Sequence, residues 1–157
     1  MSLRNITFGL LGLYSVLALL HAWSLPFSAD EAHYALYGSF TDWSYFDHPP
    51  MVGWMQSIAL FFSETEFALR IIPILLSTLS LLILFKLAKS DFGEKAAFVT
   101  ILLFISAPIL QILPFGMIPE TPLILTGLLN IWILKKIQAH QGEQLLDWVL
   151  LGLILGA

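Results

Sequence analysis

Long apolar runs, separated by short polar stretches, make up most of the chain. Four of these runs have the length and composition of membrane-spanning helices, each of which takes about 20 residues. They lie at about 6–27, 67–87, 96–114 and 122–137. A fifth apolar run covers 147–157 and stops at the last residue of the sequence. The pattern predicts an all-α membrane protein, a bundle of several spans.

A polar segment, 28–66, separates the first two spans. Within it, Ser28 and Glu31 stand in the S-x-x-E order of a capping box. In this motif the serine side chain and the glutamate side chain each accept a hydrogen bond from a backbone N–H at the start of a helix. The spacing therefore predicts a short helix over 29–38 and a structural role for Glu31.

A second short helix is predicted over 50–62, directly after the Pro49–Pro50 pair, which suits a helix start. This apolar stretch is too short to cross a bilayer, so we expect an interfacial or re-entrant helix. The distribution of positive charge supports this. If the stretch does not cross the bilayer, six of the seven Lys and Arg residues fall on one side of the membrane. These are Arg4, Lys86, Lys89, Lys95, Lys135 and Lys136.

The positive-inside tendency assigns that basic side to the cytoplasm. The sequence thus predicts a multi-pass protein of the inner (plasma) membrane, with its N-terminus in the cytoplasm and the segment 28–66 on the periplasmic side. A cleaved signal peptide is the alternative for the first run. That run is longer than a typical signal core, and the residues after it form a poor cleavage site.

Composition supports the membrane assignment and excludes other classes. Hydrophobic residues make up 58% of the chain and charged residues 11%, and the mean hydropathy is +0.85. The net charge is -4 and no basic run occurs, so nucleic acid is not an expected partner. The absence of cysteine excludes disulfides, thiol nucleophiles and thiolate metal sites.

The predicted helix over 29–38 places Asp30, His33, Tyr34 and Tyr37 on one face. A carboxylate, an imidazole and two phenols on one face at the membrane surface are suited to binding a polar ligand. The alternative is an amphipathic helix that lies on the lipid with its polar side in water. Asp30 also has a structural alternative, since an acid in the first turn interacts favourably with the helix dipole.

Asp47 and His48 precede the two prolines in the sequence "FDHPP". Either side chain could cap the helix that follows, and this is their structural alternative. Together with Asp30 and His33 they supply ligand types that bind metals. Their spacing matches no standard metal motif, so no cofactor is required by the sequence, and a divalent metal ion bound by these residues is an alternative that no motif supports.

Arg70 and Glu120 are the other charged candidates on the outer side. Arg70, at the outer end of the second span, could extend to the lipid headgroups or bind a phosphate through its guanidinium group. Glu120 lies in the sequence "MIPETPL", a turn between the third and fourth spans. Its structural alternative is that of a solvated acid at a helix start.

The succession "DEAHY", "DWSYFDHPPMVGW", "ALRIIP" and "PETPL" after a first span resembles the N-terminal part of the GT-C glycosyltransferases. The resemblance is to the bacterial branch similar to dolichyl-phosphate-mannose protein mannosyltransferases and lipid A aminoarabinose transferases. It covers nearly the whole chain. It implies the transfer of a sugar from a polyprenyl-phosphate donor to a lipid, glycan or protein acceptor at the outer membrane face.

The resemblance also implies residue roles. Asp30 corresponds to the catalytic acid-base residue of the family, Asp47 and His48 line the same cavity, Arg70 lies near the donor phosphate, and Glu120 occupies a second acidic position. Glu31, His33 and Tyr34 complete the predicted substrate-binding set. Many relatives carry Tyr or Arg in place of His33, and Asp in place of Glu120.

Full members of that family have roughly a dozen spans, so we interpret the 157 residues as an N-terminal portion and expect the isolated chain to be inactive. The alternative is a non-enzymatic membrane subunit, or a truncated relic, that binds lipid or a partner membrane protein. The two hypotheses differ in one substitution. Asp30→Asn abolishes transfer in an intact enzyme and is silent in a subunit.

Overall fold

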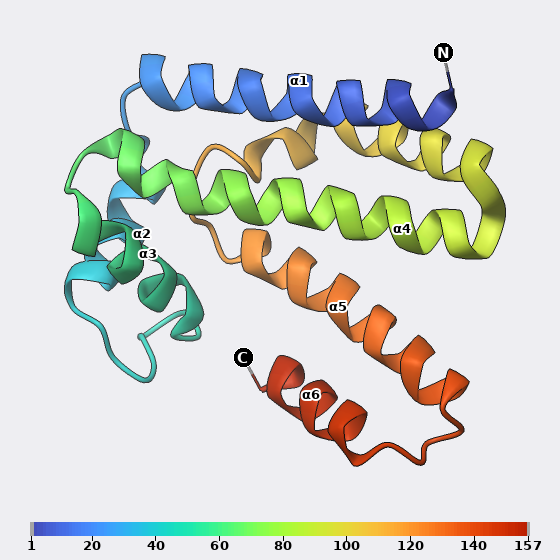
Figure 1. Ribbon diagram of the computed structural model, residues 1–157. Coiled ribbons are helices and arrows are strands. Elements are labelled where there is room, and N and C mark those ends of the chain that lie inside the picture. Colours follow the sequence, from blue (N-terminus) through green and yellow to red (C-terminus); the bar gives the residue numbers. More distant parts are fainter. Residues whose placement is uncertain (1, 157) are drawn as a thin grey trace.

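The computed structural model describes residues 2–156, and these fold into helices joined by short connections (Figure 1). The order is α1 (Leu3–Ser24), α2 (Ala29–Ser39), α3 (Met51–Phe62), α4 (Glu66–Ser106), the 3-10 helix η1 (Pro108–Ile112), α5 (Glu120–Ala139) and α6 (Leu145–Leu155). The predicted all-α class is confirmed for these residues.

Helix α1 lies along α4, and the two form the long axis of the molecule (Figure 1). Ser2 caps its start by accepting a hydrogen bond from the Asn5 backbone N–H. The helix ends at Ser24, three residues before the predicted end of the first span. Leu25 is extended because it precedes Pro26, and a residue before proline disfavours the α conformation.

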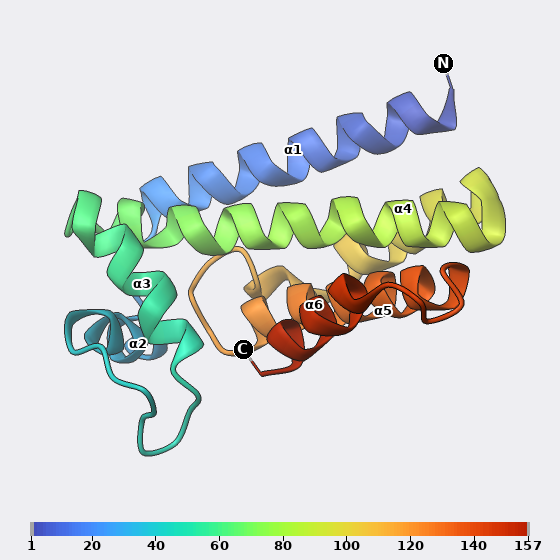
Figure 2. The same ribbon diagram turned by 60° about the horizontal axis from the view of Figure 1, so that its bottom comes forward.

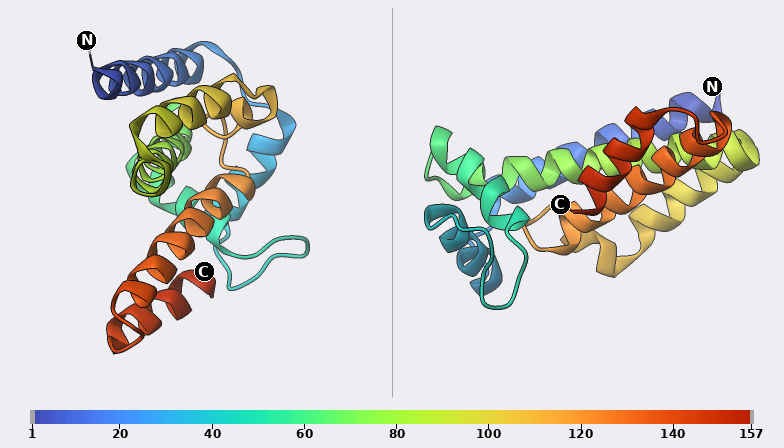
Figure 3. Two further views of the ribbon diagram at one scale, coloured as in Figure 1. Left: turned by 90° about the vertical axis from the view of Figure 1, so that its right-hand side faces the viewer. Right: turned by 90° about the horizontal axis from the view of Figure 1, so that it is seen from below.

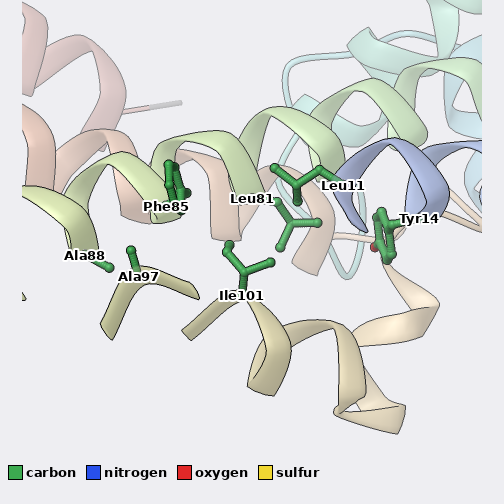
Figure 4. Packing of buried hydrophobic residues seen from close by; sticks show 7 residues of the cluster. All are labelled: Leu11, Tyr14, Leu81, Phe85, Ala88, Ala97 and Ile101. Carbon is green, nitrogen blue, oxygen red and sulfur yellow. The ribbon is translucent and has the colours of Figure 1, made fainter. Parts of the chain in front are cut away.

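Helix α4 consists of two antiparallel arms, 66–92 and 94–106, that reverse direction at Gly93. Gly93 has φ 84° and ψ 174°, a conformation that is essentially restricted to glycine. The core lies where α1 meets the two arms, and Figure 4 shows its seven side chains pointing toward one another. They are Leu11, Tyr14, Leu81, Phe85, Ala88, Ala97 and Ile101.

The predicted span over 96–114 is α-helical only as far as Ser106, so the second half of that prediction is wrong. Pro108 explains the early end, because a proline removes a backbone donor and restricts the residue before it. A 3-10 helix and an irregular segment follow, up to Pro119. The connection to α5 is therefore much longer than the turn predicted around Glu120.

Helices α2 and α3 pack against each other at one end of the long axis (Figure 2). They approach closely at Gly38, where an added Cβ would lie 2.6 Å from the Cβ of Gln56. Both helices begin and end within one residue of their predicted bounds, 29–38 and 50–62.

Helices α5 and α6 form a second antiparallel pair beside α4 (Figure 3). The chain reverses between them at Gln141 and Gly142, which have φ 54° and 78°. Nδ1 of His140 lies 2.6 Å from Oδ2 of Asp147, which joins the end of α5 to the start of α6.

Two helices within residues 2–156, α1 and α4, are long and apolar enough to cross a membrane. About a third or less of their most apolar windows is buried in the protein. Exposed side chains such as Leu13, Leu20 and Leu75 therefore leave apolar faces open to a lipid environment or to further helices.

Candidate functional site

The site is built around a buried ion pair between Glu31 in α2 and Arg70 in the first arm of α4. Arg70 Nε lies 2.6 Å from Glu31 Oε1, and Arg70 Nη2 lies 2.9 Å from Oε2. The two residues are only 8% and 4% exposed, respectively. Two parallel hydrogen bonds between a guanidinium and a carboxylate fix orientation as well as distance. The pair therefore holds the first turn of α2 against α4.

Arg70 is also bound to the end of α1. Its Nη1 donates to the carbonyls of Ala22 at 3.2 Å and Leu25 at 2.6 Å, and its Nη2 donates to the Pro26 carbonyl at 3.0 Å. With the two bonds to Glu31, all five N–H donors of the guanidinium are used within the chain. A phosphate that approached Arg70 in this arrangement would have to replace one of these acceptors.

Glu31 has a second structural role, because the predicted capping box is present. Its carboxylate accepts a hydrogen bond from the Ser28 backbone N–H at 2.9 Å, and its own N–H donates to Ser28 Oγ at 3.2 Å. A residue that caps its helix and pairs with a buried arginine has little freedom to move. The backbone that carries the neighbouring residue, Asp30, is therefore held rigidly in place.

The irregular segment before α5 packs onto this pair. An added Cβ at Gly116 would lie 2.6 Å from Glu31 Cγ, so only a glycine permits this approach. The Phe115 ring lies 4.7 Å from the His21 ring of α1, and Thr121 Oγ1 donates to the Leu113 carbonyl at 3.0 Å. These contacts bring the start of α5, and with it Glu120, to the same end of the molecule as α2.

Asp30 and Glu120 are both exposed, each in the first turn of its helix. Neither side chain makes a hydrogen bond to another residue in the described part of the chain. Both lie near Tyr34. Burial raises the pKa of the Tyr34 phenol, and the negative charges of Glu120, Asp47 and Asp30 raise it further. Three of the four predicted acids thus act on the charge environment of one phenol.

Asp47 belongs to a polar cluster with side chains of α2. Tyr37 donates a hydrogen bond to Asp47 Oδ1, and His48 Nδ1 and His33 Nε2 lie 3.0 and 3.7 Å from Oδ2. The bond from Tyr37, assisted by His48, lowers the pKa of the Asp47 carboxyl. The same bond raises the pKa of Tyr37 to about 12.

The cluster joins the loop at 40–50 to the predicted face of α2. His33 Nε2 lies 3.0 Å from the Tyr37 hydroxyl, and the Tyr34 hydroxyl lies 3.4 Å from His48 Nε2. Asp47 and His48 do not cap α3, whose N-cap is Pro50 and has no side-chain hydrogen bond. The capping alternative is therefore wrong, because both side chains turn back toward α2.

Two further residues, Tyr37 and Tyr45, complete the cluster. Tyr37 belongs to the polar face of α2 that its helical spacing from Asp30, His33 and Tyr34 predicted. Tyr45 stacks on Tyr37 with ring centroids 3.8 Å apart and donates to the Tyr37 carbonyl at 2.7 Å. It lies in a loop without periodicity, so no sequence pattern indicated it.

Within residues 2–156, His, Asp and Glu side chains form no group of three or more that could hold a metal ion. The candidate site consists of hydrogen-bonding groups and carboxylates on an exposed face of α2, and the buried Glu31–Arg70 pair anchors this helix to α4.

Comparison with known proteins identifies the class as a membrane glycosyltransferase family. The sequence model for dolichyl-phosphate-mannose-protein mannosyltransferase matches residues 47–157, and the chain belongs to this family. The matched range contains Asp47, His48, Arg70 and Glu120, whereas the first turn of α2 with Asp30 precedes it. No curated protein and no solved structure matches the chain.

Family membership supports glycosyltransfer and a membrane location, and it generally implies a polyprenyl-phosphate sugar donor. The two long apolar helices agree with a membrane location.

Proposed function

We propose that this chain forms part of a GT-C glycosyltransferase that moves a sugar from a polyprenyl-phosphate donor to a lipid, glycan or protein acceptor at the outer membrane face. One observation carries the proposal. Asp30 presents a carboxylate without a hydrogen-bonding partner among the described residues, directly beside Glu31, which is fixed by Arg70. A base must be free to accept a proton and must be held in place, and Asp30 meets both needs.

In the proposed reaction, Asp30 takes the proton of the acceptor hydroxyl while that oxygen attacks the anomeric carbon of the sugar. A new bond forms between the acceptor oxygen and the anomeric carbon, and the bond from that carbon to the phosphate oxygen breaks. The electron pair leaves with the polyprenyl phosphate. Attack from the side opposite the phosphate inverts the anomeric configuration, and the proton remains on Asp30.

The leaving phosphate gains charge and needs donors near it. Arg70 was predicted to be one of them, but its donors are all engaged in this arrangement. We propose that Arg70 is a positioning residue, which acts through Glu31 on the first turn of α2. His33 is exposed and Tyr34 and His48 are half-buried, so we propose these three, rather than Arg70, for direct contact with substrate.

For Glu31 we likewise propose a positioning role in place of direct substrate contact. We propose that Asp47 orients Tyr37 and the two histidines and that Glu120 adds negative charge near Tyr34. The proposal requires no cofactor. It assigns the α2–α3 end to the periplasmic side of the inner membrane and the N-terminus to the cytoplasm, which the placement of the lysines supports.

The test is a transfer assay in native membranes that contain the protein. A labelled sugar on polyprenyl phosphate is followed into the lipid, glycan and protein fractions, and the labelled fraction identifies the acceptor. We expect Asp30→Asn to abolish transfer, and Glu64→Gln to leave it unchanged. Glu64 is a suitable control because it is an exposed acid of the same segment that makes no side-chain hydrogen bond among the described residues.

Normal transfer by Asp30→Asn contradicts the proposal. If that variant is silent while substitutions on the exposed faces of α1 or α4 abolish the function of the membranes, the non-enzymatic subunit is the better explanation.

A further inference from the structure

A groove of about 620 Å³ lies between α4 and α5, at the opposite end of the molecule from Asp30. Figure 1 shows α5 running obliquely away from the first arm of α4. Its floor and walls are mainly apolar and include Leu79, Ile83, Leu129 and Trp132. Three lysines, Lys86, Lys135 and Lys136, also line it.

The lysines are not equivalent. Lys135 donates to Ser90 Oγ at 2.7 Å and pairs with Asp91, so its charge is compensated. Lys86 and Lys136 are exposed and form no ion pair within residues 2–156. The groove therefore carries an excess of positive charge, and no acidic side chain lines it.

The lysines also lie at a depth that suits a lipid headgroup. A rise of about 1.5 Å per residue along α4 separates Arg70 from Lys86 by about 24 Å, and the long lysine side chain can extend the rest of the way across a hydrocarbon core of about 30 Å. Lys136 Nζ lies 5.3 Å from the centre of the Trp132 ring. A tryptophan beneath a lysine is typical of the membrane interface, where the ring and the ammonium group share the headgroup layer.

We infer that this groove binds an anionic phospholipid. Its acyl chain lies along Leu79, Ile83 and Leu129, and its phosphate lies between Lys86 and Lys136. Charge complementarity selects this occupant: a zwitterionic lipid would fill the apolar part equally well but would not neutralise the two lysines. The groove is remote from Asp30 and takes no part in the proposed transfer.

Trp132 provides the measurement, because a brominated acyl chain quenches the fluorescence of a tryptophan that it contacts. The full chain is placed in phosphatidylcholine vesicles with increasing fractions of brominated phosphatidylglycerol, or of brominated phosphatidylcholine in the comparison series. The difference between the wild-type chain and Trp132→Phe isolates the signal of Trp132 from the other four tryptophans.

We expect half-maximal quenching of Trp132 at a fraction of brominated phosphatidylglycerol about 25-fold lower than that of brominated phosphatidylcholine, the preference that two lysines provide at about 1 kcal/mol each. Lys86→Gln should reduce this preference to about fivefold, because Lys136 remains. Lys95→Gln is the matched control, since Lys95 is an exposed lysine that does not line the groove, and it should retain the preference.

Equal quenching by both lipids in the wild-type chain overturns the inference, and so does an equal loss in the two lysine variants, which indicates a general surface charge. Trp132 that neither lipid quenches also overturns it, because the groove is then filled by protein, either a second copy of the chain or another membrane helix.

Discussion

At one end of α4, Arg70 is buried and donates all its hydrogen bonds to acceptors in the chain, whereas at the other end Lys89 and Lys135 pair with Glu94 and Asp91 near the surface. The hydrogen bonds of Arg70 join three elements: the end of α1, the start of α2 and the first arm of α4. The two lysine pairs lie around the reversal at Gly93 and are open to solvent or lipid headgroups. Burial makes the difference, because a buried charge that loses its partner is far more costly than an exposed one.

The Arg70 end and the Gly93 end of α4 therefore suit different tasks. The catalytic role proposed for Asp30 requires a rigid support, and the Glu31–Arg70 pair supplies one. A surface that recognises lipid headgroups needs charges that can adapt, and exposed lysines on flexible stems supply those.

Removing Arg70 is expected to have the largest effect on stability. Arg70→Met leaves Glu31 buried without its partner, and we expect a loss of about 3–5 kcal/mol in the free energy of unfolding. Denaturant titration in detergent micelles, followed by tryptophan fluorescence, measures it. The double variant Arg70→Met with Glu31→Gln should recover part of the loss, since glutamine keeps the capping box.

Lys89→Gln, which removes an exposed pair at the other end, is the control for that titration and should change stability far less. Equal losses in Arg70→Met and Lys89→Gln would show that the two ends do not differ as described.

Gly93→Ala tests whether the reversal between the two arms of α4 depends on glycine. Because alanine is strained at a φ of 84° with a ψ of 174°, we expect a loss of about 1–3 kcal/mol in the same titration. Gly127→Ala, in the regular helix α5 with open space around an added Cβ, should be neutral or slightly stabilising. Similar effects of the two changes would contradict the role given to Gly93.

Gly116→Ala tests the close contact at the site end without removing a charge. The new Cβ meets Glu31 Cγ, which two bonds to Arg70 hold in place, so we expect a loss near the lower end of about 1–3 kcal/mol. The variant should also slow sugar transfer in native membranes, because it disturbs the support of Asp30. Unchanged transfer together with reduced stability would separate the ion pair from the chemistry.

The smallest expected effect is the pH dependence of folding stability that arises from Asp47 and Tyr37. Because the folded pKa of Asp47 is lowered, its contribution is present above the ordinary carboxyl range and is lost as the pH falls through the lowered pKa. Tyr37, with a pKa of about 12, contributes below pH 10 and loses this contribution as the pH rises through about 12.

Alkaline titration of phenolate absorbance checks the Tyr37 prediction. Asp47→Asn should bring the midpoint of one tyrosine back toward 10, and Tyr37→Phe should remove that tyrosine from the titration. An unchanged curve for Asp47→Asn would mean that the hydrogen bond is absent in solution.

Much of the fold at the site end could be predicted from the sequence. The capping box of Ser28 and Glu31 and the helices over 29–38 and 50–62 follow local rules of spacing and of proline chemistry, and the structure contains all three. The end of the third span could not be predicted from hydropathy, because the residues after Ser106 are as apolar as those before it. Pro108 was the signal that mattered.

The site could be predicted in its composition but not in its pairing. Periodicity put Asp30, His33, Tyr34 and Tyr37 on one face of a helix, and the structure brings Asp47 and the charge of Glu120 to that face. The partner of Arg70 was beyond sequence analysis. A contact between residues 31 and 70 depends on tertiary packing, and a lone arginine at a span end reads equally well as a headgroup or phosphate ligand.

The most direct test of the central claim separates donor binding from transfer in the Asp30→Asn protein in native membranes. The account predicts that the donor's Kd is unchanged while the single-turnover rate at saturating donor falls by about 10²–10⁴-fold, the usual contribution of a general base. A rate equal to that of the wild-type protein, or a loss explained entirely by weaker donor binding, would contradict it.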